Sequence, residues 1–112
     1  MAVSTDIPAY MGDTTTIRAT LMEDDEVADI TGLTLVWLIS PTSEGRARVK
    51  VTVTEHEDAV NGISTATFTP SDLVAAGGPG RWYLTVVSVD SLGRELTRMM
   101  SRLQVYDRPS II

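Results

Sequence analysis

The sequence predicts an all-β fold, an antiparallel β-sandwich of about seven strands with one short helical turn. Two observations carry this prediction. Short stretches rich in β-branched residues alternate between apolar and polar side chains, and clusters of turn-forming residues separate them at near-regular intervals. The length of 112 residues fits one domain. We expect a single domain, residues 1–112, with residues 1–12 and 107–112 as extended terminal segments.

The first half of the chain contains three predicted strands. A weak strand near Val3–Tyr10 is followed by Thr14–Met22, whose alternation predicts a half-buried strand. Thr31–Ser40 is more uniformly apolar, which predicts a strand in the interior of a sheet. Its Trp37 is the candidate for a large core residue between two sheets. The other residues expected on core-facing sides are Ile17, Ala19, Leu21, Leu35 and Ile39.

Two more strands surround the middle of the chain. Ala47–Glu55 has the clearest alternation, and its outward basic side chains would discourage pairing with another sheet if it is an edge strand. Asn61 and Gly62 predict a hairpin turn, because both residues tolerate a positive φ. A strand at Ile63–Thr69 follows. The residues expected to point inward are Ala47, Val49, Val51, Val53, Ala66 and Phe68.

The last third begins with a single helical turn and continues with two strands. Either Thr69 or Ser71 is expected to cap the helical turn, and Gly77 to end it. The strands Trp82–Asp90 and Arg94–Tyr106 are joined by a hairpin turn.

Composition excludes several classes of function. The net charge of −6, with nine basic residues scattered among fifteen acidic ones, argues against nucleic-acid binding. The chain has no cysteine, so the sequence predicts neither disulfides nor thiolate metal sites. The N-terminus lacks the features of a secretory signal, and the longest apolar run, Leu33 to Ile39, is too short to span a bilayer. We therefore expect synthesis in the cytoplasm and no membrane partner.

Two features invite a chemical interpretation. The acidic residues Glu23, Asp24, Asp25 and Glu26, with Asp29 nearby, resemble a calcium loop only in composition, and we interpret them as a solvated loop. The single histidine, His56, lies between two glutamates, and no Gly-x-Ser-x-Gly nucleophile motif occurs in the sequence. We expect His56 to be an exposed turn residue, and the chain to be no enzyme and to hold no cofactor.

The strand that begins at Trp82 leaves one alternative open. If Tyr83 faces the core, as a tyrosine corner would, Trp82 faces the other side and is exposed as an interface anchor or a platform for a sugar ring. The alternative is that a loop or a neighbouring element covers Trp82.

The order of the turns and strands resembles a known family. Six short segments carry the resemblance, in this order: Gly12-Asp13-Thr14, Ile30-Thr31-Gly32-Leu33-Thr34, Asn61-Gly62-Ile63, Phe68-Thr69-Pro70-Ser71-Asp72-Leu73, Gly80-Arg81-Trp82-Tyr83 and Asp90-Ser91-Leu92-Gly93-Arg94. Their order and spacing resemble the immunoglobulin-like N-terminal domain of phage baseplate upper proteins and related tail-fibre or head-fibre adaptors. The resemblance covers roughly residues 10–106. It implies an immunoglobulin-like sandwich and no catalytic residue. Members of the family usually continue into a long C-terminal segment, whereas this chain stops at Ile112. We therefore also expect a stand-alone adaptor, neck or decoration protein, or a domain on which other proteins build.

The resemblance implies a non-enzymatic structural protein of a tailed phage or prophage particle, located in the virion, that docks onto other virion proteins as a homo-oligomer or as part of a lattice. The candidate interface residues are apolar or aromatic and lie mostly near the two termini: Ile7, Pro8, Tyr10, Trp82, Tyr106, Pro109, Ile111 and Ile112. Two alternatives remain at this point. The terminal segments are simply mobile ends, or the chain is a carbohydrate-binding or adhesin-type module in which Trp82 stacks on a sugar.

Overall fold

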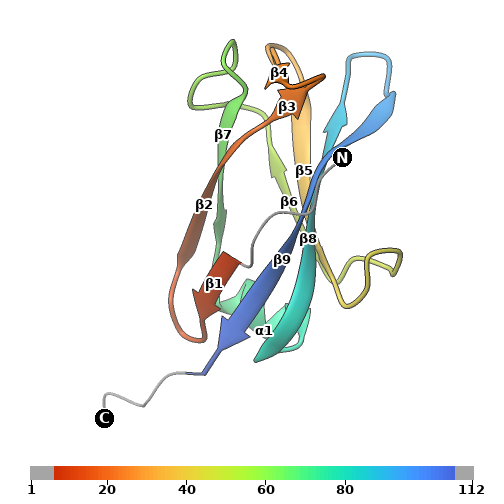
Figure 1. The fold of residues 1–112 in the computed structure, drawn as a ribbon. Helices are drawn as coiled ribbons and strands as arrows, with labels where there is room; N and C mark the ends of the chain where they lie inside the picture. The colour runs from red at the N-terminus through yellow and green to blue at the C-terminus, as the bar shows by residue number, and fades with distance from the viewer. Residues whose placement is uncertain (1–6, 108–112) are drawn as a thin grey trace.

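The computed structural model of the protein describes residues 7–107 and is mostly β, with one short helix (Figure 1). The elements are β1 (Ile7–Tyr10), β2 (Thr15–Thr20), β3 (Met22–Glu23), β4 (Glu26–Val27), β5 (Thr34–Ser40), β6 (Val49–Val53), β7 (Ile63–Phe68), α1 (Pro70–Ala76), β8 (Gly80–Val89) and β9 (Glu95–Tyr106). The predicted all-β class with one short helical turn is confirmed. The observed strands lie within the predicted ranges, apart from the earlier start of β8 at Gly80 and the additional short hairpin of β3 and β4. Val3–Asp6, the first part of the predicted first strand, lies outside the described residues.

The strands form a five-stranded sheet in the order β1-β9-β8-β5-β6, a two-stranded sheet of β2 and β7, and the small β3-β4 hairpin. The uniformly apolar β5 lies between β8 and β6, so the prediction of an interior strand is confirmed. β6 is an edge strand that carries Lys50 on its exposed side. The expectation of a purely antiparallel fold is wrong at one pair, because β1 runs parallel to β9.

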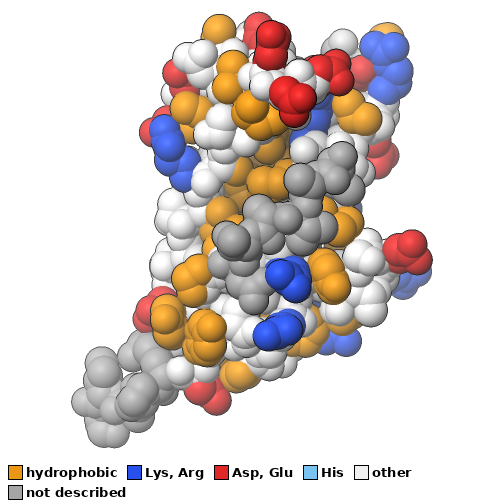
Figure 2. All heavy atoms as spheres, in the orientation of Figure 1, with side chains coloured by type: hydrophobic (Ala, Val, Ile, Leu, Met, Phe, Trp, Pro, Cys, Tyr) orange, Lys and Arg blue, Asp and Glu red, His pale blue; other side chains and the backbone are white. Residues whose placement is uncertain are grey.

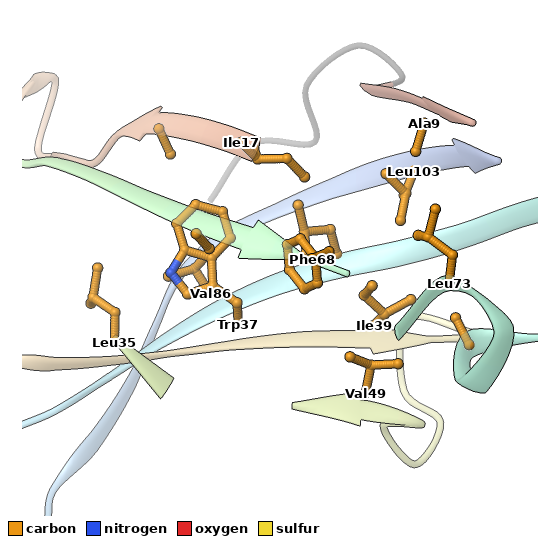
Figure 3. Packing of buried hydrophobic residues seen from close by; sticks show 14 of the residues in the cluster. Ala9, Ile17, Leu35, Trp37, Ile39, Val49, Phe68, Leu73, Val86 and Leu103 are labelled. Carbon is orange, nitrogen blue, oxygen red and sulfur yellow. The ribbon is translucent and has the colours of Figure 1, made fainter. Parts of the chain in front are cut away.

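The hydrophobic core lies between the five-stranded sheet and the β2-β7 pair (Figure 3). Trp37 is completely buried and meets the Phe68 ring edge-on at a centroid distance of 6.4 Å. Trp37 comes from the larger sheet and Phe68 from the smaller one, so this contact joins the two layers. The predicted core-facing residues that are buried are Ile17, Ala19, Leu21, Leu35, Trp37, Ile39, Val49, Ala66 and Phe68. Val51 and Val53 are partly buried against the same cluster.

The acidic stretch forms a tight hairpin between β3 and β4. Glu23 pairs with Glu26, and Asp24 and Asp25 between them have φ values of 51° and 65°. A two-residue hairpin turn of this kind requires positive φ at both central positions, and aspartate tolerates that conformation better than most residues. The predicted strand Thr14–Met22 is therefore divided at Leu21, after which the chain turns into the hairpin.

The Asn61-Gly62 turn is present but does not join two long strands. It closes a small loop in which Asp58 and Ile63 exchange backbone hydrogen bonds, while β6 and β7 belong to different sheets. Gly62 has a φ of 73°, and a Cβ atom there would lie 2.6 Å from one backbone carbonyl oxygen and 2.7 Å from another. Only glycine fits this turn without displacing the backbone.

The helix α1 is capped as its sequence predicts. The Thr69 hydroxyl accepts a hydrogen bond from the Asp72 backbone N–H at 3.2 Å, and the Asp72 carboxylate accepts one from the Thr69 N–H at 2.8 Å. This reciprocal capping box selects Thr69 over Ser71 as the N-cap, and Gly77 ends the helix. The helix places Leu73 and Ala76 in the core.

Candidate interaction surface

The outer face of the five-stranded sheet can be assigned from the strand register. Residues directly opposite one another on paired strands point to the same side of a sheet. Val86 lies opposite the buried Trp37, so both point inward. The next residue, Val87, lies opposite Val36, and both point outward and are only half-buried. The outer face is the side on which a partner can contact the sheet.

The terminal strands bring together residues that are far apart in the sequence. Tyr10 on β1 lies opposite Tyr106 on β9, and their rings stack with a centroid distance of 5.4 Å and an interplanar angle of 28°. The two side chains are 44% and 46% exposed. Pro8 and Gln104 lie opposite one another on the same side. We call Pro8, Tyr10, Gln104 and Tyr106 the terminal patch.

The remaining candidate residues near the termini divide into two groups. Ile7 lies opposite the buried Leu103 and packs against the core, so it does not belong to the exposed patch. Pro109, Ile111 and Ile112 lie outside the described residues. β1 is the edge strand of the sheet, and Pro8 removes one backbone donor from that edge. The edge at β1 is therefore less suited to pairing with a further strand.

A shallow groove lies on the same outer face. It has a volume of about 180 Å³ and is lined by Val36, Leu38, Lys50, Val87, Val89 and Glu95, which come from β5, β6, β8 and β9. We call these six residues the sheet groove. Its four apolar side chains are half-buried, whereas Lys50 and Glu95 are exposed. No sequence pattern indicated this groove, because the groove depends on which strands are neighbours.

Trp82 is covered rather than exposed, so the interpretation of an exposed tryptophan is wrong. It lies opposite the buried Leu103 and packs against the core, while Tyr83 lies on the other face. Its indole N–H donates to the Gly78 carbonyl at 3.0 Å, and the Arg48 guanidinium lies 5.4 Å from the ring centroid. The strand begins at Gly80, and the glycine turn before it folds over the indole, as the alternative interpretation predicted.

The tyrosine corner is also wrong at Tyr83. This side chain lies opposite Ser40 on the outer face of the sheet, so it does not face the core. A tyrosine corner requires the ring to pack inward while the hydroxyl reaches back to the backbone.

His56 is a structural residue, and the expectation of an exposed turn residue is wrong. Its Nδ1 lies 2.9 Å from the Ser64 hydroxyl, and its Nε2 lies 2.7 Å from the Leu33 carbonyl oxygen. A carbonyl oxygen only accepts, so Nε2 carries the proton of that hydrogen bond. Ser64 is completely buried and is therefore out of reach of a substrate. The histidine joins three segments of chain and is not placed for nucleophilic catalysis.

The acidic hairpin does not assemble a metal site. Within residues 7–107, no group of three or more histidine, cysteine, aspartate or glutamate side chains is arranged to hold a metal ion. Glu23 instead forms an ion pair with Arg98 at 3.5 Å. Figure 2 shows several red acidic side chains close together at the upper end of the molecule, where Figure 1 places the β3-β4 hairpin. The side chains of Glu23, Asp24, Asp25 and Glu26 are all exposed to solvent.

Two aspartates stabilise turns through hydrogen bonds to the backbone. The Thr31 hydroxyl and then the Thr31 N–H lower the pKa of Asp29, which accepts both hydrogen bonds. The backbone N–H of Arg94 is the main cause of the lowered pKa of Asp90, and the Arg94 guanidinium and the Leu92 N–H act in the same direction. Both carboxylates favour their ionised form in the folded protein.

No protein-family model matches this chain, and no curated protein sequence matches it significantly. In the described part of the chain, no helix is long and apolar enough to cross a membrane. The protein is therefore an all-β protein with two packed sheets and an outer face that carries an aromatic pair and a groove.

Proposed function

We propose that this chain is an immunoglobulin-like β-sandwich that serves as a non-enzymatic structural protein of a tailed phage or prophage particle. In this proposal it docks onto other virion proteins through the terminal patch. The order of turns that resembles baseplate upper proteins supports the assignment to a phage particle, and the two packed sheets are compatible with the fold expected from it.

The single observation that supports docking best is the stacked pair of Tyr10 and Tyr106. Tyrosine is enriched at protein interfaces, because its ring buries a large area while its hydroxyl finds a polar partner. Stacking and the parallel pairing of β1 with β9 hold the two rings in place before a partner arrives. Less conformational entropy is then lost on binding.

The pair also lies where the chain enters and leaves the described fold. Met11 continues the contact between the terminal segments, since its backbone N–H donates to the Tyr106 carbonyl at 2.8 Å. A docking surface at this place would connect the domain to a particle without disturbing the core. The pairing of Ile7–Tyr10 with the end of β9 argues against the alternative of mobile ends for these residues.

The rival function of a carbohydrate-binding module has lost its main support. It depended on an exposed Trp82, and one face of that ring lies against Arg48 while the indole N–H is already bonded to Gly78. No other observation favours sugar over protein as the partner.

The test is the composition of purified particles. A tagged full-length chain is expressed from the phage or prophage genome that encodes it, the particles are purified on a density gradient, and the ratio of the chain to the other particle proteins is measured by quantitative mass spectrometry. We expect a fixed ratio, and a loss of about tenfold or more when Tyr10 and Tyr106 are both replaced by serine, as for hot-spot residues. The matched control is Leu92→Ser, which replaces an apolar side chain that is 75% exposed in the turn before β9, at the opposite end of that strand.

Three outcomes separate the parts of the proposal. A chain that is absent from purified particles overturns the virion assignment. A chain that is present at the same ratio in the double tyrosine variant leaves the virion assignment standing but overturns the terminal patch as the docking surface. A similar loss in Leu92→Ser shows that the effect is not specific to the patch.

A further inference from the structure

The sheet groove combines an apolar centre with two opposite charges. Lys50 lies on the edge strand β6, and Glu95 is the first residue of β9, at the other end of the four strands that form the groove. Lys50 lies opposite Leu38 on β5, whereas Glu95 lies opposite Val89, which in turn lies opposite Thr34. The two charges therefore occupy opposite corners of the groove.

The distance between the corners prevents an ion pair within one chain. Four residues along β5 correspond to about 14 Å, and the three strand spacings from β6 to β9 also correspond to about 14 Å, so the two Cα atoms are roughly 20 Å apart. Within residues 7–107, the ion pairs involve other residues, and neither Lys50 nor Glu95 takes part in one. Each charge is available to a partner.

A second copy of the same chain meets both charges at once. A twofold axis that lies in the plane of the face, at right angles to the line from Lys50 to Glu95, exchanges the two corners. Each Lys50 then faces Glu95 of the second copy, and the four valine and leucine side chains of one groove meet the same side chains of the other. Such isologous contacts are the commonest arrangement in homodimers.

The strand geometry is compatible with this arrangement. The line between the corners crosses the strands at about 45°, and the twofold axis, at right angles to that line, also makes an angle of about 45° with the strands. Rotation about this axis turns the strand direction by twice that angle, so the strands of the two sheets cross at about 90°. Orthogonal packing of two sheets is one of the two usual modes of face-to-face contact.

We propose that the sheet groove is a self-association surface, on which a second copy of this chain packs with twofold symmetry and pairs each Lys50 with Glu95 of the other copy. The inference does not depend on a role in a phage particle, because it follows from the charges and apolar side chains of the groove alone. It also leaves the terminal patch, on β1 and the end of β9, available for a different partner.

The test is a charge exchange, followed by sedimentation velocity across a concentration series at low salt. Lys50→Glu places like charges against each other at both symmetric contacts, and so does Glu95→Lys. We expect each single variant to weaken dimerisation about tenfold or more, because repulsion replaces two attractive contacts. The double variant restores the attraction with the charges exchanged. An equimolar mixture of the two single variants forms a heterodimer, because each partner supplies the charge that the other lacks.

Matched controls separate the groove from net charge. Arg46→Glu and Glu44→Lys make the same changes in charge at exposed residues of the loop between β5 and β6, and neither residue lines the groove. We expect both controls to associate as the unchanged protein does. Circular dichroism confirms that every variant is folded.

Four results would overturn the proposal. The first is that the unchanged protein stays monomeric up to about 1 mM, which would correspond to a binding free energy weaker than about 4 kcal/mol. The second is that the protein associates but the single groove variants do so equally well, and the third is that the loop controls weaken association as much as the groove variants. The fourth is that the single variants weaken association but neither the double variant nor the mixture restores it, which would exclude the twofold pairing of the two charges.

Discussion

Replacing His56 by alanine tests whether the histidine is a structural residue. In the folded protein its imidazole joins the Ser64 hydroxyl on β7 to the Leu33 carbonyl just before β5, at 2.9 and 2.7 Å. Ser64 belongs to the two-stranded sheet, and Leu33 immediately precedes β5 of the five-stranded sheet. The apolar contacts of the core also join the two layers, so removal of the ring breaks only the polar link between them.

The expected loss of stability follows from the burial of the partners. The Ser64 hydroxyl is completely buried, and leaving such a group without a partner costs about 1–2 kcal/mol. The Leu33 carbonyl lies in a half-buried residue, where water replaces part of the lost hydrogen bond, so its loss adds about 0.5–1 kcal/mol. His56→Ala should therefore lower the free energy of unfolding by about 1.5–3 kcal/mol and the melting temperature by about 6–12 °C.

Urea unfolding followed by tryptophan fluorescence is the appropriate measurement, because the buried Trp37 reports the loss of the core. The control Glu55→Ala changes the preceding residue, which is exposed, and should alter stability by less than about 0.5 kcal/mol. Ser64→Ala removes the buried hydroxyl together with its need for a partner, so the double variant with His56→Ala should lose less than the sum of the single variants by about 1 kcal/mol. A loss below about 0.5 kcal/mol in His56→Ala, or strict additivity in the double variant, would refute a structural role for the hydrogen bond.

Three further changes test other parts of the structure. Gly62→Ala should destabilise the protein by more than about 2 kcal/mol, because the new methyl group would meet two carbonyl oxygens. The control Gly32→Ala, at a residue with a φ of 77° and open space around it, should cost only about 1 kcal/mol. Equal losses of stability in thermal unfolding would contradict the steric argument. Arg48→Ala should cost about 1–2 kcal/mol, because it removes the stacking on Trp82 and a hydrogen bond to the Ala76 carbonyl, while Arg46→Ala in the same loop should be neutral in the same assay. Asp29 and Asp90 have pKa values below the ordinary 3.9 or so, so the stability they contribute is present above about pH 4 and is lost as the pH falls through their lowered values. Replacing both aspartates by asparagine should make the urea midpoint depend less on pH between about pH 4 and pH 2. An unchanged pH dependence would show that the two carboxylates do not contribute to stability.

Local sequence patterns were sufficient for much of the fold. The alternation along β2 and β6 correctly predicted which side chains are buried, because a strand places successive residues on opposite faces whatever its neighbours are. The Gly77 end of α1 was also predictable, and the N-cap was narrowed to Thr69 or Ser71, since capping is a contact between residues three or four apart. These elements depend on short-range interactions only.

The facing of Trp82 could not be predicted from its own strand. Alternation shows that Trp82 and Tyr83 face opposite sides, but it does not say which side is the core. That choice depends on the pairing with β9 and on the glycine turn that folds over the indole. The role of His56 was missed for a similar reason, because its partner Leu33 lies 23 residues away.

The candidate surface was predictable only in part. Tyr10 and Tyr106 were chosen as interface residues because they are aromatic and lie near the ends of the strand pattern. Their contact with one another required the parallel pairing of β1 and β9, which no local pattern predicts. The groove, with Lys50 and Glu95 at opposite corners, required the complete order of four strands.

The sequence by itself determined the all-β class, the short helix and the core-facing residues of β2, β5, β6 and β7, because these follow from side-chain periodicity and from contacts within a few residues. Only the tertiary structure decided the strand order, the face on which Trp82 lies and the groups that meet His56. These depend on contacts between residues that are distant along the chain, and the free energy of such contacts depends on how the whole chain packs.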